Sequence, residues 1–324
     1  MKNLKILKMF KQRRIMTQTK FENIVEKWKE NKQKYVKISS FCTYSLLIEK
    51  HILPYFKNKN KITEQDVERF IFQKISLGLS EKTVKDIFLV LKMILNFAFK
   101  NKLLHCVFLD VKFPKCKQEK KLKIFSKQEH KRLLRFVKAN FSFKNLGIYI
   151  CLSTGLRIGE ICGLKWGDID IQEGVLKVSR TIQRVYIEKT SKTQIIFTSP
   201  KTKSSQREVP LNRSLIQILR LMRKISNPDY FVLTNSEKPL EPRNFRKYYN
   251  KLLEKLGLPK IPFHGLRHSF ATRCIESRCD YKTVSVILGH SNITTTLNLY
   301  VHPNLEQKKK CINQMSSFLG SEGI

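Results

Sequence analysis

The first third of the chain carries apolar residues at helical spacing. Phe21, Ile24, Val25 and Trp28 form the first stripe, which is typical of the buried face of an amphipathic helix. Three more stripes follow along the chain: Tyr44, Leu47, Ile48 and Ile52; Val67, Phe70, Ile71 and Ile75; and Val84, Ile87, Phe88, Leu91, Leu95 and Ala98. This pattern predicts four helices within residues 21–102, packed as a small all-helical domain.

Local signals predict where some of these helices begin and end. Thr63, with Asp66 three residues later, is expected to be the N-cap of the third helix. Either Ser80 or Thr83 is expected to cap the fourth helix. The second helix should end near Pro54, because proline lacks the amide hydrogen that a helix interior needs.

After about residue 124 the pattern mixes strands with helices. β-rich segments at 168–171 and 175–187, with Gly174 between them, predict a hairpin, and a third strand is expected at about 206–209. Helices are expected on both sides of these strands, near Ser126–Ala139, near Phe143–Ser153, and from Asn212 to about Met315. The predicted fold class is therefore mainly α with a small antiparallel β-sheet.

Composition divides the chain into parts. Residues 1–20 carry seven basic residues and no acidic one, which fits either a basic arm or a disordered, over-extended start, since Met16 could also begin the protein. Pro114 stands among lysines in a segment typical of a linker. We expect an arm at 1–20, a helical domain at 21–102, a basic linker at 103–123, a mixed α/β domain at 124–304 and a tail at 305–324.

The charge balance points to a polyanionic partner. Lys and Arg number 63 against 26 Asp and Glu, a formal net charge of +37. A Lys-rich proteome would raise the lysine count of any protein, but an excess of this size also favours a partner that neutralises it. A membrane surface is the other candidate, and no run of 18 apolar residues is present. Nucleic acid is the favoured partner.

Cysteine usage suggests a reducing compartment. The eight cysteines form no CxxC pair and no Cys/His spacing typical of a zinc site. The basic N-terminus is too charged and its apolar part too short for an export signal. We therefore expect a cytoplasmic protein, associated with the nucleoid when it is bound to DNA.

Four short segments carry residues suited to catalysis. They are Thr154-Gly155-Leu156-Arg157 with Glu160, Pro200-Lys201-Thr202-Lys203, His264-Gly265-Leu266-Arg267, and Leu288-Gly289-His290 with Tyr300 ten residues later. Each segment alone is weak, because a single Arg is usually solvated and a single helical Tyr usually packs. Two Arg, two His, a loop Lys and a Tyr in this order are more informative.

These segments resemble the phage integrase family of tyrosine recombinases. The resemblance covers about 124–305 with specific motifs, while the preceding helical region fits the family's core-binding domain by shape only. It implies a catalytic domain at 124–304, a core-binding domain at 21–102, and DNA cleavage and rejoining through a 3′-phosphotyrosine. The active site it implies consists of Arg157, Lys201, His264, Arg267, His290 and the nucleophile Tyr300. Lys201 matches the family's loop lysine better than Lys203.

Elementary chemistry agrees with these roles. An arginine fork reaches both non-bridging oxygens of a phosphodiester and stays ionised, so Arg157 and Arg267 are the expected clamp. A phenol, with an ordinary pKa of about 10, needs a base or a positive potential to act as a nucleophile. His264 or His290 could take its proton, His290 could instead bind the phosphate, and Lys201 is the candidate acid for the leaving 5′ oxygen.

Other residues and ligands bear on this interpretation. Glu160 either orients the active site or is simply an acid favoured in the first turn of a helix. We expect His268 to pack, because it points away from Arg267, and His302 to be a surface histidine. The chain has no GxxxxGK[ST] loop and no evident carboxylate cluster for two metal ions, so no metal or cofactor is expected.

Two other functions compete with recombination. A non-catalytic DNA-binding protein would use residues 280–300 as a helix-turn-helix with Gly289 at the turn, but would leave Arg157 and Arg267 unexplained. A type IB topoisomerase would use similar tyrosine chemistry only to relax DNA. We expect the integrase of a mobile element, acting as a homotetramer on two specific double-stranded DNA sites, with or without an accessory DNA-bending protein. Residues 305–324 are expected to dock onto a neighbouring subunit.

Overall fold

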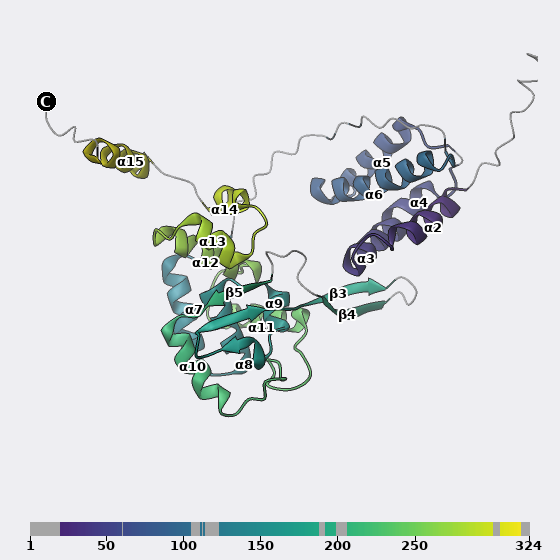
Figure 1. Ribbon diagram of the computed structural model, residues 1–324. Helices are drawn as coiled ribbons and strands as arrows, with labels where there is room; N and C mark the ends of the chain where they lie inside the picture. The colour runs from purple at the N-terminus through teal and green to yellow at the C-terminus, as the bar shows by residue number, and fades with distance from the viewer. Residues whose placement is uncertain are drawn as a thin grey trace, which may run out of the picture. The chain divides into compact units, whose positions relative to one another are not determined.

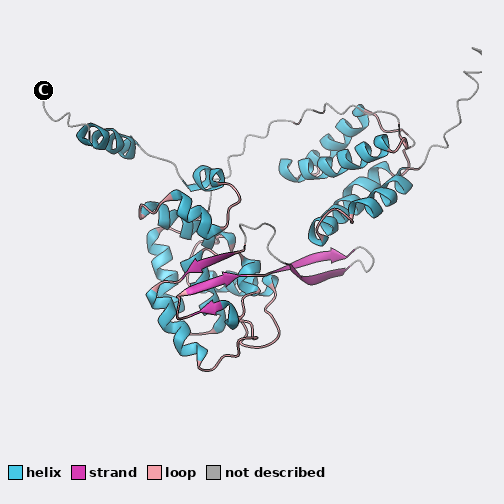
Figure 2. Cartoon of the chain, viewed as in Figure 1, coloured by secondary structure: helices cyan, strands magenta, loops and turns pink. Residues whose placement is uncertain are grey.

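The computed structural model describes residues 20–59, 61–104, 111, 113, 123–187, 192–198, 206–300 and 305–318. Two compact units make up the chain, one formed by Met1–Glu119 with Val185–Gln194 and the other by Lys120–Arg184 with Ile195–Ile324. Helices dominate both, and the strands form two small sheets (Figure 2). The predicted fold class is confirmed.

The first unit contains the four helical regions that the apolar stripes predict. They are α2 (Phe21–Lys32), the run α3 (Ile38–Leu47), η1 (Ile48–Ile52) and α4 (Leu53–Phe56), then α5 (Glu64–Ser76) and α6 (Glu81–Lys100) (Figure 1). The residues of all four stripes meet in one core, in which Phe56 contacts the rings of Phe21 and Phe70. Burial of these side chains is what stabilises the bundle.

Polar caps fix two of these helices at the predicted positions. Thr63 and Asp66 form a reciprocal capping box at the start of α5. Ser80, rather than Thr83, caps α6, and its hydroxyl accepts the Thr83 amide at 3.2 Å.

The second helical run ends at Phe56, two residues past Pro54, so its expected end near Pro54 is confirmed. A π-helical turn at Ile48–Ile52 comes first, in which the Leu53 amide donates to the carbonyl of Ile48. The wider turn shifts the hydrogen-bond register just before the proline, so the missing amide and the bulky ring are accommodated.

The second unit is built around α8 (Phe143–Thr154), which is buried along most of its length. Helices α7 (Lys127–Ala139) and α12 (His264–Glu276) pack against it. Ser126 and Glu129 form a capping box that starts α7. The other helices of this unit are α9 (Ile158–Cys162), η2 (Trp166–Asp168), α10 (Arg213–Arg223), α11 (Pro242–Lys255), α13 (Tyr281–Leu288), α14 (Ile293–Tyr300) and α15 (Leu305–Phe318).

A three-stranded antiparallel sheet lies beside these helices, in the order β1 (Ile169–Asp170), β2 (Val175–Val178), β5 (Arg207–Pro210). Leu176 pairs with Ile169 on one side and with Val209 on the other. The predicted hairpin around Gly174 and the predicted third strand are both present.

The single strand expected at 175–187 was wrong, because it is broken into β2 and β3 (Thr181–Ile187). At the break, the Ser179 hydroxyl and the Arg180 guanidinium both bind the carboxylate of Asp168. These side-chain bonds turn the chain out of the first sheet, and β3 pairs instead with β4 (Lys192–Thr198), which was not predicted. Among the described residues, no helix is long and apolar enough to cross a membrane.

Candidate active site

The first predicted active-site arginine follows a tight helix end. Helix α8 stops at Gly155, whose φ of 67° lies in the left-handed region. A Cβ on this residue would lie 2.7 Å from the Phe270 ring and 2.8 Å from Leu288, so glycine fits here and larger residues do not. Leu156 then turns into the core, and Arg157 stands just before α9 with its side chain 35% exposed.

Glu160 binds Arg157 in two ways. Its carboxylate accepts the Arg157 backbone amide at 2.9 Å and Nη1 of the guanidinium at 2.7 Å. The first bond caps α9, and the second fixes the arginine side chain. The two interpretations of Glu160, as a first-turn helix acid and as a residue that orients the site, therefore describe one carboxylate that makes both contacts.

Arg207 is a member of this cluster that the sequence motifs did not reveal. From β5 its side chain, 4% exposed, donates from Nη1 and Nη2 to the two carboxylate oxygens of Glu160, at 3.1 and 3.0 Å. Burial alone would raise the pKa of Glu160, but the hydrogen bonds and charge of Arg207, with the charge of Arg157, outweigh it and lower that pKa. The carboxylate is therefore ionised and held from two sides.

Helix α12 supplies the second predicted arginine. Arg267 is 1% exposed and donates from Nη1 to the carbonyl of Gly155 at 3.0 Å. Burial, with the nearby charge of Arg157, lowers the pKa of Arg267 to about 9, which still leaves it charged at neutral pH. His264, one turn earlier on α12, keeps an exposed surface, but protein atoms surround part of its ring. This partial desolvation, together with the charges of Arg267 and Arg157, lowers its pKa.

Three arginines converge on the C-terminal end of α13. Arg207 Nε donates to the carbonyl of Ile287 at 2.6 Å, Arg267 Nη2 to that of Leu288 at 2.7 Å, and Arg157 Nη2 to that of Gly289 at 3.2 Å. The last carbonyls of a helix have no partner within it and carry its negative dipole end, so guanidinium groups are well matched to them. The arginines of the site thereby position the segment that leads to His290 and Tyr300.

His290 comes directly after the left-handed Gly289, whose φ is 66°. Its Nδ1 lies 2.8 Å from the hydroxyl of buried Thr296, which fixes the ring. Burial and the surrounding arginines, Arg267 first, lower the pKa of His290 to about 4. The ring is therefore neutral at neutral pH.

Tyr300 ends α14 and is 7% exposed. Burial raises its pKa, while the charges of Arg267 and Arg157 act in the opposite direction. Its hydroxyl lies 2.6 Å from Nδ1 of His268. The expectation that His268 merely packs was wrong: it shares a helix face with His264, four residues earlier, and that spacing was the signal that the sequence offered.

Some of the predicted residues cannot be placed. Lys201 and Lys203, the two candidates for the general acid, lie outside the described residues, as does His302. The other five predicted residues, Arg157, His264, Arg267, His290 and Tyr300, all belong to the second unit together with Glu160.

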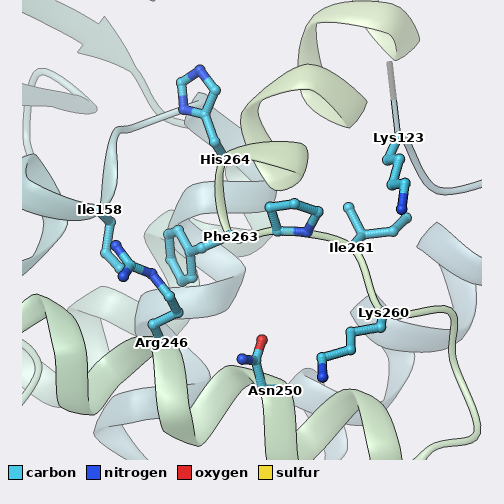
Figure 3. A pocket seen from close by; sticks show the side chains of 9 residues that line it. Lys123, Ile158, Arg246, Asn250, Lys260, Ile261, Phe263 and His264 are labelled. Atoms are coloured by element: carbon cyan, nitrogen blue, oxygen red, sulfur yellow. The ribbon is translucent and has the colours of Figure 1, made fainter. Parts of the chain in front are cut away.

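A depression of about 540 Å³ borders His264 (Figure 3). Arg246 and Asn250 project into it from α11, while Phe263 and His264 begin α12 at its edge. Lys123 and Lys260 also line it, so the described residues around the depression include three cationic side chains and no acidic one. Such a surface suits an extended anion bound beside His264, one of the predicted active-site residues.

Comparison with known proteins places this arrangement in a family. The chain matches the phage integrase family over residues 123–307, and the N-terminal SAM-like domain of phage integrases over residues 20–75. A tyrosine recombinase XerC-like protein of Caldanaerobacter subterraneus is 32% identical over 299 residues, covering 83% of this chain and 76% of that protein. The ICEBs1 integrase of Bacillus subtilis is 25% identical over 286 residues, covering 84% and 76%.

A solved structure agrees on the fold. The Tn1549 transposon integrase, determined in complex with transposon right end DNA, superposes with a TM-score of 0.75 at 22% identity, covering 92% of this chain and 100% of that one. The family match spans more than half of the chain, and the XerC-like relative aligns over most of it. The chain therefore belongs to the phage integrase family and is a tyrosine recombinase, an enzyme that breaks and rejoins DNA.

Proposed function

We propose that this recombinase cleaves one DNA strand with Tyr300 while Arg157 and Arg267 hold the scissile phosphate. The observation that carries the proposal is the convergence of these two guanidinium groups on one helix end, from which His290 and Tyr300 follow directly. The side chain of Arg157 is partly exposed, and its hydrogen bond to Glu160 holds it in place. It can therefore bind a phosphate without changing position.

The chemical step is a balanced exchange of esters. The Tyr300 oxygen forms a bond to phosphorus as the bond from phosphorus to the 5′ oxygen breaks, which leaves a 3′-phosphotyrosine. The phenol proton passes to His264 or His290, and the 5′ oxygen takes a proton from Lys201. Attack by a 5′ hydroxyl of the other duplex reverses these steps, so rejoining needs no ATP.

The histidines fit this scheme in their neutral form. Burial and neighbouring arginines lower the pKa of both His264 and His290, so each can accept a proton at neutral pH. An incoming phosphate adds a negative charge beside them and raises their pKa, which favours proton uptake during the reaction.

Double-stranded DNA is the proposed substrate. The net charge of +37 and the basic depression beside His264 both suit a phosphate backbone. The helical domain at 21–102, the basic linker at 103–123 and the catalytic domain at 124–304 would then each contact DNA. The biological role proposed is that of a mobile-element integrase, since the ICEBs1 integrase aligns over 84% of this chain. Its place of action would be the cytoplasm, at the nucleoid.

The proposed assembly is a tetramer that forms on DNA. Exchange between two duplexes breaks four strands, and each chain brings one Tyr300, so four subunits are needed. Helix α15 exposes the apolar side chains of Ile312, Met315 and Phe318, and we assign it to docking on a neighbouring copy. An accessory DNA-bending protein is compatible with this assembly.

Nicked suicide duplexes that carry candidate end sequences of a mobile element test the proposal. The wild-type chain should form a covalent adduct that survives SDS, and Tyr300→Phe should form none. Tyr281→Phe, which alters an exposed tyrosine in the same unit, is the matched control and should still form the adduct. An adduct that persists in Tyr300→Phe would refute the nucleophile.

Two differently labelled duplexes separate recombination from simple relaxation. Joined products that carry both labels are expected. Loss of supercoils with no joined product would instead indicate topoisomerase activity.

A further inference from the structure

The nucleophile of this recombinase has a partner that the proposed mechanism does not use. His268 lies on α12 directly after Arg267, and its Nδ1 is 2.6 Å from the Tyr300 oxygen. The two rings are 5.7 Å apart between centroids and tilted by 53°, so they meet at their polar ends rather than by stacking. This contact joins a side chain of α12 to the reacting atom at the end of α14.

Both members of the pair are held in place by their surroundings. The Tyr300 ring packs in an apolar cluster with Ala271, Val284 and Leu288. The His268 ring meets the His264 ring edge-on, at 4.5 Å and 84°. Packing therefore limits the motion of the phenol ring, and the hydrogen bond sets the direction of its O–H bond and so of the oxygen lone pairs that it leaves unused.

We propose that His268 is a positioning residue for the nucleophile, which holds the Tyr300 hydroxyl through Nδ1 and orients its oxygen for attack on the scissile phosphate. The proposal rests on the function assigned to Tyr300 above. It gives His268 a role different from the proton transfer proposed for His264 and His290.

The direction of this hydrogen bond follows from acidity. Burial raises the pKa of Tyr300 above its ordinary value of 10, whereas burial, with the charges of His264 and Arg267, lowers the pKa of His268 to about 4. The proton therefore stays on the oxygen. Tyr300 donates and Nδ1 accepts, so the remaining proton of the neutral imidazole is on Nε2.

In the resting site this imbalance leaves the proton on the phenol, and the same holds for His290, whose pKa is also about 4. The positioning role of His268 therefore rests on its contact with the Tyr300 oxygen and not on its basicity. The lone pairs of the oxygen that the hydrogen bond leaves unused remain available to phosphorus. His268 thus orients the hydroxyl, and the proton leaves by another route when the phosphate has bound.

Two substitutions at position 268 distinguish a positioning role of His268 from simple packing, because the two explanations predict opposite orders of cleavage rate. His268→Phe fills the ring's space but removes the acceptor, whereas His268→Asn keeps an acceptor near the position of Nδ1 but fills less space. If His268 positions the hydroxyl, single-turnover cleavage of the suicide duplex at saturating DNA should slow about 10-fold to 100-fold in His268→Phe, and His268→Asn should recover about 10-fold of that. DNA affinity should stay the same in both variants.

The opposite order of rates would overturn the proposal. If the phenylalanine variant cleaves faster than the asparagine variant, His268 only packs. If both are equally slow and an ionisation disappears from the pH–rate profile, His268 is the base. If both cleave like the wild type, the contact does not matter.

A second measurement needs no DNA and no cleavage, so it stands or falls separately from the function of Tyr300. The chain contains 7 histidines, few enough to resolve in the full-length protein with ¹⁵N-labelled histidine, and His268→Asn assigns the signal. At pH 7 the His268 signals should be those of the neutral form with its proton on Nε2, and Tyr300→Phe should shift the Nδ1 signal. An Nδ1 signal that Tyr300→Phe leaves unmoved would show that the contact is absent, whatever the protein does to DNA.

Discussion

Arg207 and Glu160, 47 residues apart in the chain, form an ion pair in which two guanidinium nitrogens each meet one carboxylate oxygen, at 3.1 and 3.0 Å. The pair is buried, with side chains 4% and 5% exposed. Arg207 also donates to the carbonyl of Ile287, and Glu160 also holds Arg157. This one pair therefore ties β5, α9 and the end of α13 into a single support for Arg157, the arginine proposed to face the phosphate.

Replacing Arg207 by alanine should lower the free energy of unfolding by about 3 kcal/mol, because removing one partner leaves a buried charge poorly compensated. Arg207→Lys should recover part of this loss, since it restores a charge but not the planar fork. Urea unfolding measures the effect. A Trp28→Phe background leaves Trp166, which is 5% exposed, as the only tryptophan and as a reporter of the second unit.

The neighbouring strand position provides the control. Glu208 pairs with Lys177 at 3.4 Å, but both side chains are more than half exposed. Glu208→Gln should cost less than about 1 kcal/mol, as exposed pairs usually do. If Arg207→Ala costs no more than this control, the buried pair is not a structural support.

Arg267→Lys should separate catalysis from DNA binding. A lysine keeps the charge but cannot reach a phosphate and the carbonyls of Gly155 and Leu288 in the same fork geometry. Single-turnover cleavage at saturating DNA should fall about 100-fold to 1000-fold, as expected when one donor to a developing oxyanion is lost. DNA affinity, measured by filter binding, should change little.

Lys260→Ala should have the opposite effects on rate and affinity. Lys260 lines the basic depression and is not one of the residues that bind the carbonyls at the end of α13. The substitution should weaken DNA affinity and leave the saturated cleavage rate near that of the wild type. Equal losses of cleavage rate and DNA affinity in both variants would contradict the proposal that Arg267 acts on the scissile phosphate while Lys260 contacts the DNA backbone.

Several elements were accessible from the sequence because their causes are local. Apolar stripes predicted the helices of the first unit, and the Thr63–Asp66 pair predicted the start of α5. Pro54 predicted the end of the second helical run to within two residues, and the π turn before it accommodates the proline in the last helical turn. The break after Val178 depends on Asp168, ten residues earlier, and no periodicity reveals such a partner.

The active-site residues that lie in sequence motifs could be predicted from the sequence. Those that join the site only through tertiary contacts were harder to predict. Arg157, Arg267 and Tyr300 lie in recognisable segments. Arg207 belongs to no such segment, yet strand alternation places it on the same face as Val209, which is 1% exposed, and this was a usable signal for an inward-pointing arginine. The spacing of His268 from His264 placed both on one helix face, but the hydrogen bond from Tyr300 to His268 depends on how α14 returns to α12, which that spacing does not encode.

The stability of the second unit should fall as the pH is lowered from about 6.5 to about 4. His268 and His290 have an ordinary pKa of 6.5, and burial together with neighbouring cationic groups lowers both to about 4 in the folded chain. Within that window the unfolded chain binds protons at these positions and the folded chain does not, so acid favours unfolding. Above pH 6.5 neither state is protonated there, and this pH dependence disappears.

His290→Asn should flatten that pH dependence, because it removes one of the two titrating groups. Urea unfolding of both proteins at pH values from 4 to 7.5 provides the comparison. Parallel curves for the wild type and the variant would show that His290 titrates alike in the folded and unfolded chains.

DNA affinity should depend steeply on salt. If six or more phosphates are neutralised, the logarithm of the association constant should fall against the logarithm of salt concentration with a slope of about −5 or steeper. Fluorescence anisotropy with a labelled duplex between about 50 and 200 mM salt measures it. A slope near zero would contradict the inference that the net charge of +37 serves DNA binding.

Removal of the tail should affect assembly more than cleavage. Helix α15 exposes Ile312, Met315 and Phe318, which follow one another every three residues and so share one side of the helix. An apolar stripe with Phe318 89% exposed is costly in water and favours burial against a neighbouring subunit. Deleting residues 311–324 should therefore reduce cooperative binding to paired sites and strand exchange, while half-site cleavage by a single subunit persists.

A point substitution makes the same test without shortening the chain. Phe318→Ser removes the most exposed of these apolar side chains and should weaken assembly in the same direction, whereas Lys309→Ser, in the basic run of the same helix, should weaken it less. Sedimentation on a duplex with two sites distinguishes monomers from tetramers. If the deletion leaves the tetramer intact, α15 is not the docking segment, and the contacts between subunits must come from other surfaces of the two units.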